Sequence, residues 1–131
     1  MLRVKTTIKS SDVNGIGLFS DQFIPAGTVT WQYDPGFDPH FTIEQFDSLS
    51  DFTKETVLTH GYFDHDMQVY ILCSDDQRFI NHSPNPNITS TPSQDVASRD
   101  IQPGEELTCD YAQYEQDWFE RRNENRSSFD A

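Results

Sequence analysis

The stretch that most constrains this chain is residues 78–87, RFINHSPNPN, because it combines hydrogen-bonding side chains with residues that restrict the backbone. Pro84 and Pro86 each fix φ, lack a donor and push the residue before them toward extended backbone. Two interpretations are open from this segment alone. It is either a turn held by local side-chain hydrogen bonds, or a shaped loop that presents Asn81 and His82 to a ligand. The rest of the chain has to decide between them.

The chain has the composition of one small domain. Its 131 residues, 34% of them hydrophobic, can bury roughly two-thirds of the unfolded surface. No run of about 18 apolar residues occurs, and residues 1–11 lack the apolar stretch of a signal peptide. We therefore expect a cytoplasmic, intracellular protein with no membrane partner. Cys73 and Cys109 are too few for a disulfide scaffold or a four-thiolate zinc site and are expected to be free thiols.

The charge of the chain is strongly negative. A net charge of −13 and a pI near 4.3 disfavour direct binding to nucleic acid or to anionic membranes, since both reward clustered Lys and Arg. Residues 34–76 carry eight Asp and two Glu against one lysine, Lys54. This segment is either a surface that contacts a basic partner or a solvated acidic surface adapted to the environment of the protein.

Alternating apolar and polar residues between Gly- and Pro-rich turns predict a mostly β domain with short helices. In residues 68–74, odd- and even-numbered side chains should face opposite sides of a strand. Gly15 and Gly17 should form a bend before another strand. A hairpin is expected with its turn at residues 92–95. The expected strands are residues 2–9, 28–33, 68–74, 88–91, 96–99 and 106–111.

Two short helices are expected within the acidic stretch. Thr42 and Gln45 form a capping-box pattern that begins the first helix. The second should run over residues 51–60 and end at Gly61. Aromatic residues at i, i+4 spacing predict a terminal helix over residues 113–126.

Three segments occur in the order and spacing found in the SET-domain protein lysine methyltransferases. They are GIGLF at residues 15–19, RFINHSPNPN at residues 78–87 and RDIQPGEELTCDY at residues 99–111. Each segment alone is common, but the series is specific. The chain therefore resembles this family over residues 5–111, and its brevity resembles the small stand-alone SET proteins of bacteria and viruses.

The resemblance implies a fold as well as a function. We expect a mostly β, β-clip SET fold with short helices, in which several small sheets surround a knot-like C-terminal crossing. Residues 1–131 would form a single SET domain. Residues 34–66 would be an acidic helical insert, and residues 112–131 a C-terminal tail whose helix acts as a lid.

The resemblance also implies a site for S-adenosylmethionine, with S-adenosylhomocysteine as the product. The methionine part would contact the first glycine turn and the start of the 78–87 loop. The amino group and the adenine would contact the Asn-His pair, and aromatic residues of the tail would close over the adenine. The residues implied are Asn14, Gly15, Ile16, Gly17, Arg78, Phe79, Asn81, His82, Trp118 and Phe119.

By the same resemblance, Tyr111 matches the catalytic tyrosine and aromatic residues line a channel for the target lysine. The channel residues implied are Trp31, Tyr33, Tyr70 and Cys109. Cys109 stands where family members often carry an aromatic residue that limits the number of methyl groups. Its small side chain leaves room for higher methylation, but neighbouring aromatic residues can compensate, so mono-, di- and trimethylation all stay open. The nucleophile is neutral lysine, whose pKa near 10.4 should fall on burial beside a cation, and no general base is strictly required.

The chain departs from the family pattern at Pro84. Many members have a cysteine there that joins three later cysteines to bind zinc, and no cysteine follows Tyr111 in this chain. Because the two absences agree, we expect a site with no metal.

The expected partner is a lysine-containing basic peptide or protein, bound by a monomer or a homodimer beside the acidic segment. Two other functions are considered. One is a noncatalytic SET-like module that binds basic peptides or cofactor. The other is a metal hydrolase, which the absence of HxxxH and HxH spacings disfavours.

Overall fold

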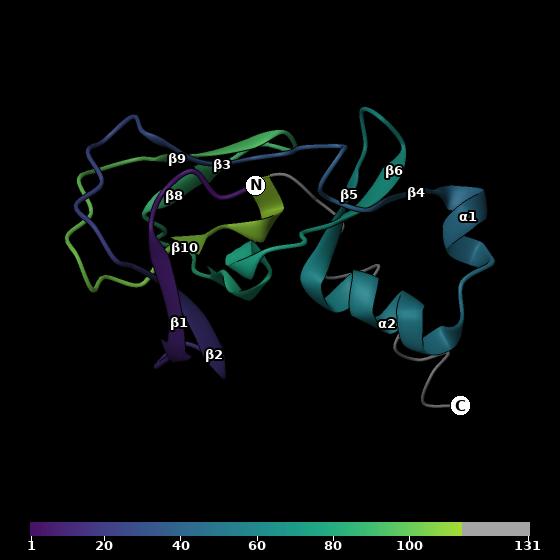
Figure 1. The fold of residues 1–131 in the computed structure, drawn as a ribbon, viewed down its shortest axis with the longest axis horizontal. Helices are drawn as coiled ribbons and strands as arrows, with labels where there is room; N and C mark the ends of the chain where they lie inside the picture. The colour runs from purple at the N-terminus through teal and green to yellow at the C-terminus, as the bar shows by residue number, and fades with distance from the viewer. Residues whose placement is uncertain (114–131) are drawn as a thin grey trace.

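The computed structural model describes residues 1–113, which form short strands around two α-helices (Figure 1). The strands are β1 (Thr6–Ser10), β2 (Ile16–Ser20), β3 (Val29–Gln32), β4 (His40–Thr42), β5 (Gly61–Asp64), β6 (Val69–Leu72), β7 (Asn81–His82), β8 (Ile88–Ser90), β9 (Gln94–Ala97) and β10 (Thr108–Cys109). The helices are α1 (Ile43–Asp47), α2 (Asp51–His60) and the 3₁₀ helices η1 (Asp76–Phe79) and η2 (Tyr111–Gln113). The mostly β prediction is confirmed. Within residues 1–113, every helix is too short or too polar to cross a bilayer.

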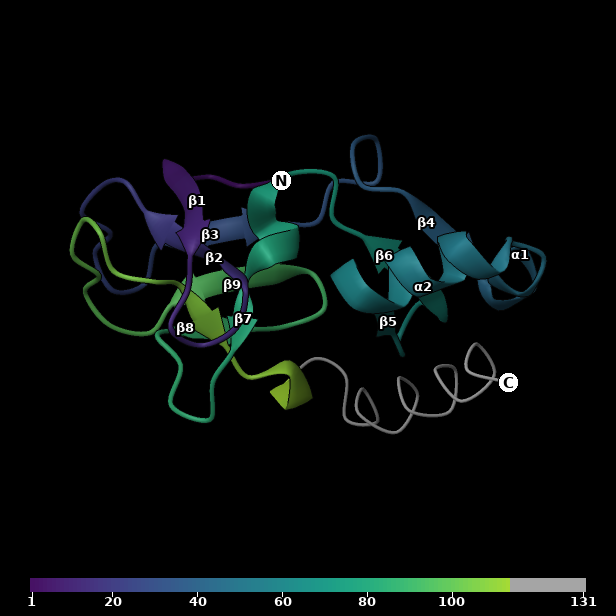
Figure 2. The same ribbon diagram turned by 90° about the horizontal axis from the view of Figure 1, so that it is seen from below.

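The largest sheet brings the C-terminal motif beside the Asn-His pair. Its strand order is β3-β9-β8-β10-β7, and Figure 2 shows β7, β8 and β9 close together at the same end of the molecule. Strand β10 is parallel to both of its neighbours, with Thr108 opposite Asn81 and Cys109 opposite both His82 and Ile88. Since the pairing places residues 81–82 and 108–109 in register, two motifs far apart in sequence meet at one place.

A smaller sheet, with the order β4-β6-β5, carries the two helices. Figures 1 and 2 show α1 and α2 at the end of the molecule away from β1 and β2. The alternation predicted for residues 68–74 is confirmed, because Ile71 and Cys73 pack with Trp31 in one cluster while Tyr70 packs with Phe46 in another. Strand β6 therefore joins two separate hydrophobic clusters through its two faces.

The helix boundaries follow the local signals in the sequence. Thr42 and Gln45 form the predicted capping box at the start of α1, and α2 runs over the predicted residues with Gly61 as its C-cap. A Cβ atom at Gly61 would lie 2.2 Å from the carbonyl oxygen of Ile71 and 2.7 Å from that of Val57. Glycine is required there because two stretches of backbone approach closely.

The third cluster lies between the largest sheet and the N-terminal hairpin β1–β2. Its side chains are almost fully buried, and each large one contributes about 1.5–3 kcal/mol relative to an exposed position. Its members are Leu18, Ile24, Ile80, Ile88, Ala97, Ile101, Leu107 and Cys109, with Tyr111 packed against them.

Several sequence predictions need correction. The hairpin turn is not at residues 92–95, because the amide of Thr91 donates to Gln94 at 2.9 Å and β9 already begins at Gln94. Because β9 begins two residues earlier than predicted, Asp95 lies inside the sheet, where it is buried. Strands β4 and β5 were not expected, the strand predicted at residues 106–111 is reduced to β10, and the 78–87 loop begins within η1. The predicted terminal helix, including Trp118 and Phe119, lies outside the described residues.

Candidate functional site

The side chain of Asn81 connects all three segments that carry the family resemblance. Its Nδ2 atom donates to the carbonyl oxygen of Asn14 at 3.0 Å and to Oε2 of Glu106 at 2.9 Å, and it lies 3.2 Å from Oγ of Ser11. One buried amide therefore holds the first glycine turn and the GEEL segment against the Asn-His pair. Asn81 also brings the carbonyl oxygens of Asn14 and Ile16 close together. Each carbonyl oxygen can accept a second hydrogen bond, so this bracing role is compatible with a role in binding.

The carboxylate of Glu106 lies against Gly17. It accepts from the hydroxyl of Ser11 at 2.7 and 2.9 Å. A Cβ atom at Gly17 would lie 2.5 Å from Oε2 of Glu106, closer than side chains approach one another. Sequence reasoning did not select Ser11 or Glu106, although Glu106 lies in the GEEL segment whose likeness to the family was recognised.

Open space lies beside this cluster at Gly15. The residue has φ of +46°, and a Cβ atom built there would meet no other atom within 4 Å. The neighbouring carbonyls of Asn14 and Ile16 both lie within hydrogen-bonding reach of Asn81. The turn thus presents backbone acceptors beside an exposed glycine, to which solvent or a ligand has access.

Asn87 holds the segment that leads to Tyr111. Its side-chain amide donates to the carbonyl oxygen of Glu106 at 2.8 Å and accepts from the amide of Thr108 at 2.9 Å. The Asn87 side chain thus bonds one backbone carbonyl and one backbone N–H, as a neighbouring strand would. The end of the 78–87 loop therefore holds the start of β10 in place.

Tyr111 is attached to the 78–87 loop at both ends. Its backbone N–H donates to Nδ1 of His82 at 3.1 Å, and its hydroxyl donates to the carbonyl oxygen of Ile80 at 2.6 Å. The rings of His82 and Tyr111 lie 5.2 Å apart. Because Nδ1 of His82 accepts a hydrogen bond, the neutral imidazole carries its proton on Nε2.

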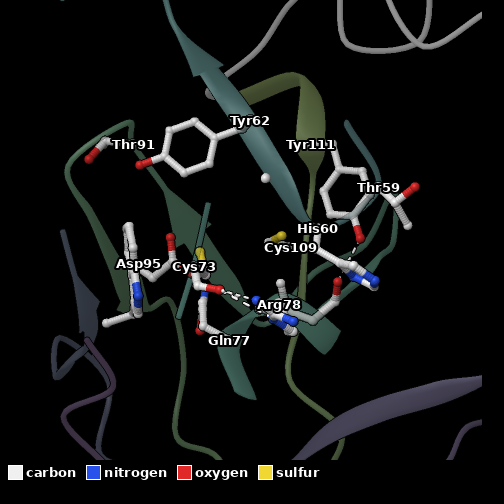
Figure 3. Close-up of a pocket in the computed structure, with 13 residues that line it drawn as sticks. Thr59, His60, Tyr62, Cys73, Gln77, Arg78, Thr91, Asp95, Cys109 and Tyr111 are labelled. Atoms are coloured by element: carbon white, nitrogen blue, oxygen red, sulfur yellow. Dashed lines mark hydrogen bonds between the residues drawn. The ribbon is translucent and has the colours of Figure 1, made fainter. Parts of the chain in front are cut away.

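A pocket opens beside Tyr111 (Figure 3), with a cavity volume of about 40 Å³. A volume of this size holds a few water-sized groups, which suits the end of a side chain. Trp31, Tyr62 and Cys109 supply apolar walls, and Asp95 and Gln77 supply polar groups. The complete lining is Trp31, Thr59, His60, Gly61, Tyr62, Cys73, Gln77, Arg78, Ile80, Thr91, Asp95, Cys109 and Tyr111.

Four of the residues singled out from the sequence line this pocket together, namely Trp31, Arg78, Cys109 and Tyr111. Nε and Nη2 of Arg78 donate to the carbonyl oxygen of Cys73 at 3.2 and 3.1 Å. Its guanidinium is therefore on the pocket side and not at the glycine turn, although η1 itself packs against β1 and β2.

Three other predicted residues lie outside the pocket lining. Tyr33 is half-buried with its ring 6.4 Å from that of His40, and burial raises the pKa of its hydroxyl above 10.0. The ring of Tyr70 stacks on that of Phe46 at 3.9 Å within the helical cluster. The ring of Phe79 lies 5.9 Å from that of His60. Tyr70 thus has a packing role that accounts for its burial.

Sequence reasoning missed the most unusual residue of the pocket, Asp95. Its side chain accepts a hydrogen bond of 2.6 Å from Nε2 of Gln77, and it is only 4% exposed. Burial raises the pKa of this carboxyl to about 6, opposed by the neighbouring Ser90, by the hydrogen bond from Gln77 and by the Met1 ammonium. The alternation of Gln94, Asp95, Val96 and Ala97 was the signal available, but the turn-forming residues before it concealed the start of β9.

Both cysteines are buried free thiols. Burial raises the pKa of Cys73 well above 9.0, so this thiol is uncharged near neutral pH. Among residues 1–113, His, Cys, Asp and Glu side chains do not gather in a group of three or more that could hold a metal ion.

Comparison with known proteins decides the family. The family model of the SET domain matches residues 15–112, which is most of the chain. The chain belongs to the SET-domain family. In this SET domain, the matched region includes Asn81, Glu106, the pocket and Tyr111, and begins just after Ser11 and Asn14.

Solved structures show the same fold. A Chaetomium thermophilum Polycomb Repressive Complex 2 structure, bound to an inhibitor, matches with a TM-score of 0.64 and 18% identity over 89% of this chain. A Plasmodium falciparum protein classed as a histone methyltransferase matches with a TM-score of 0.59 and 18% identity, covering 84% of this chain and 95% of that one.

The length comparison limits what can be transferred. This chain covers 16% of the polycomb chain, so the likeness concerns one domain of a much larger protein. No curated protein matches the sequence. At these identities the structural likeness shows the fold.

Proposed function

We propose that this SET domain is an S-adenosylmethionine-dependent protein-lysine N-methyltransferase. The observation that carries the proposal is the placement of Tyr111, which is tied to His82 and Ile80 and lines a small pocket with Cys109. The Asn81-centred cluster follows in the chain immediately after Ile80. A pocket for a side chain thus lies next to a region with the acceptors and open space for a cofactor.

The residues around Asn81 fit S-adenosylmethionine. The carbonyls of Asn14 and Ile16 suit its amino group, and the open space at Gly15 leaves room for its methionine part. Asn81 and His82 would contribute further polar contacts. When bound, the cofactor supplies a methyl group activated by a sulfonium.

The chain itself would supply the environment for the amine. Trp31, Tyr62 and Cys109 line the pocket with apolar surface, and loss of water disfavours the charged form of a lysine there. Tyr111 would orient the amine through its hydroxyl, which the Ile80 carbonyl holds in a fixed direction. Holding the reacting groups in line accounts for most of the acceleration that such a site can provide.

The substrate we propose is a lysine within a basic peptide or protein. Six of the ten carboxylates in residues 34–76 are exposed, and four of these six lie on α1 and α2. Such a surface attracts peptides with basic residues next to the target lysine.

The direct test is incubation with labelled S-adenosylmethionine and a set of basic peptides and proteins, followed by identification of the labelled residue by mass spectrometry. We expect label on the ε-amine of lysine. Absence of transfer to every substrate, with the protein folded, would contradict the proposal and favour a noncatalytic module.

A further inference from the structure

The pocket contains a buried carboxylate that the general SET mechanism does not use. Asp95 is 4% exposed and Gln77 is 6% exposed, and a hydrogen bond of 2.6 Å joins them. Burial of a carboxylate is costly unless a cation or several donors compensate. Gln77 is neutral, so its amide replaces only part of the lost hydration.

The fold holds Asp95 in place from three sides. In the sheet, Asp95 of β9 lies opposite Trp31 of β3 and Ser90 of β8. Gln77 comes from η1, immediately before Arg78. Because strands and η1 position these groups together, the carboxylate is a fixed part of the pocket wall.

The Met1 ammonium lowers the pKa of the Asp95 carboxyl, but its ion pair is with Asp38. Among residues 1–113, Lys, Arg and His side chains form no ion pair with Asp95. Arg78 directs its guanidinium at the carbonyl oxygen of Cys73. The Cys73 thiol and the Tyr62 hydroxyl are neutral near pH 7, because burial raises both pKa values.

The arrangement also places Asp95 where a side chain would reach it. Figure 3 shows Asp95 and Gln77 on one side of the pocket and Tyr111 and His60 on the other. A side chain inside the pocket therefore lies between the carboxylate and Tyr111. The apolar surfaces of Trp31 and Cys109 suit the methylene stem of a long cationic side chain.

We propose that Asp95, held by Gln77, is the cation-binding group of this pocket and receives the ammonium of the target lysine on entry, before the amine loses its proton to solvent and becomes the neutral nucleophile. The inference rests on the proposed function in taking lysine as that side chain. It makes Asp95 a residue that determines specificity, selecting a positively charged side chain over an uncharged one of the same shape.

The test is a binding experiment that needs no catalysis. Two peptides that differ only in lysine or norleucine at the target position are titrated against wild type, Asp95→Asn and Asp21→Asn, with and without S-adenosylhomocysteine. Asp21 is exposed and lies outside both the pocket and the 34–76 segment, so it controls for the loss of one negative charge. Thermal melting verifies that each variant is folded.

We expect wild type and Asp21→Asn to prefer the lysine peptide by roughly 10- to 100-fold, the range of one hydrogen bond to a charged group. Asp95→Asn should lose most of that preference. The same lysine-to-norleucine ratio in wild type and Asp95→Asn would overturn the inference, as would a wild type with no preference for lysine.

Methyl transfer measured in parallel separates the two proposals. Transfer by wild type together with an unchanged ratio in Asp95→Asn would refute the role of Asp95 and leave the methyltransferase standing. A lysine preference that depends on Asp95 in a protein without transfer would refute the enzyme and support the cation-binding pocket.

Discussion

The hydroxyl of Tyr111 donates a hydrogen bond of 2.6 Å to the carbonyl oxygen of Ile80, the residue directly before the Asn-His pair. This bond fixes the hydroxyl at the pocket, which Ile80 and Tyr111 both line. The backbone bond from Tyr111 to Nδ1 of His82 secures the other end of the residue. The tyrosine is thus oriented before any ligand binds, which lowers the entropy that must be lost to reach a reactive arrangement.

Replacement of Asn81 should affect stability and cofactor binding together. Asn81→Ala removes the donor shared by Asn14 and Glu106, and leaving buried acceptors without it costs about 1–3 kcal/mol. We expect a lower free energy of unfolding in urea and weaker binding of S-adenosylhomocysteine by calorimetry. Asn85→Ala, at an exposed position of the same loop, should change neither. Equal effects of the two substitutions would contradict the bracing role of Asn81.

The buried carboxylate of Asp95 should make stability depend on pH. Its pKa is raised from 3.8 to about 6 in the folded protein, so its contribution to stability is complete below pH 4 and is lost as pH rises through 6. Asp95→Asn removes this dependence and should be more stable than wild type by up to about 3 kcal/mol above pH 7, and by much less near pH 4.

Urea unfolding of both proteins between pH 4 and pH 8 measures that difference directly. Other titrating groups contribute equally to both proteins and cancel. A difference that is constant across this range would show that Asp95 is not protonated preferentially in the fold.

Cys109 should influence how many methyl groups a lysine accepts. Its buried side chain lines the pocket beside Tyr111, and Cys109→Phe would fill space that a methylated amine needs. We expect fewer methyl groups per lysine by intact-mass analysis, with a stability cost of roughly 1–3 kcal/mol from overpacking. Cys109→Ala should keep the wild-type product distribution. Identical distributions for the Phe and Ala variants would remove Cys109 from this role.

The acidic segment should make substrate binding sensitive to salt. Exposed charges are screened within about 8 Å at physiological ionic strength, so KM for a basic peptide should rise several-fold between 50 and about 500 mM salt, on the order expected for a few surface contacts. A peptide whose flanking Lys and Arg are replaced by Gln should lose this response. If both peptides respond alike, residues 34–76 are a solvated surface and not a recognition surface.

Local signals explain what could be predicted from the sequence. Helix α2 was placed at residues 51–60 because its end is marked by Gly61, and the two faces of residues 68–74 follow from alternation in β6. The order of the three family segments likewise identified Tyr111 and Asn81 as neighbours in one site. Each of these predictions rests either on a local signal within a few residues or on the order of segments known from the family.

The rest depends on contacts between distant segments. Asp95 was placed in a turn because Pro92 and Ser93 precede it, and only the pairing of β9 with β3 and β8 shows that it is buried. Tyr62 was not selected because Gly61 was taken only as the end of α2 and no strand was predicted at residues 61–64. The guanidinium of Arg78 is directed into the pocket by the carbonyl of Cys73, a partner that sequence cannot indicate.

The most direct test of the account compares methyl transfer by wild type, Tyr111→Phe and Tyr33→Phe on the same lysine peptide under saturating S-adenosylmethionine. Tyr33 lies outside the pocket lining, so its substitution controls for loss of a hydroxyl. We predict that Tyr111→Phe lowers kcat by roughly 100-fold or more, as expected when a positioned polar group is removed from a reacting centre, while peptide binding stays within a few-fold of wild type. Equal kcat values for wild type and Tyr111→Phe would contradict the central claim that this hydroxyl acts on the target amine.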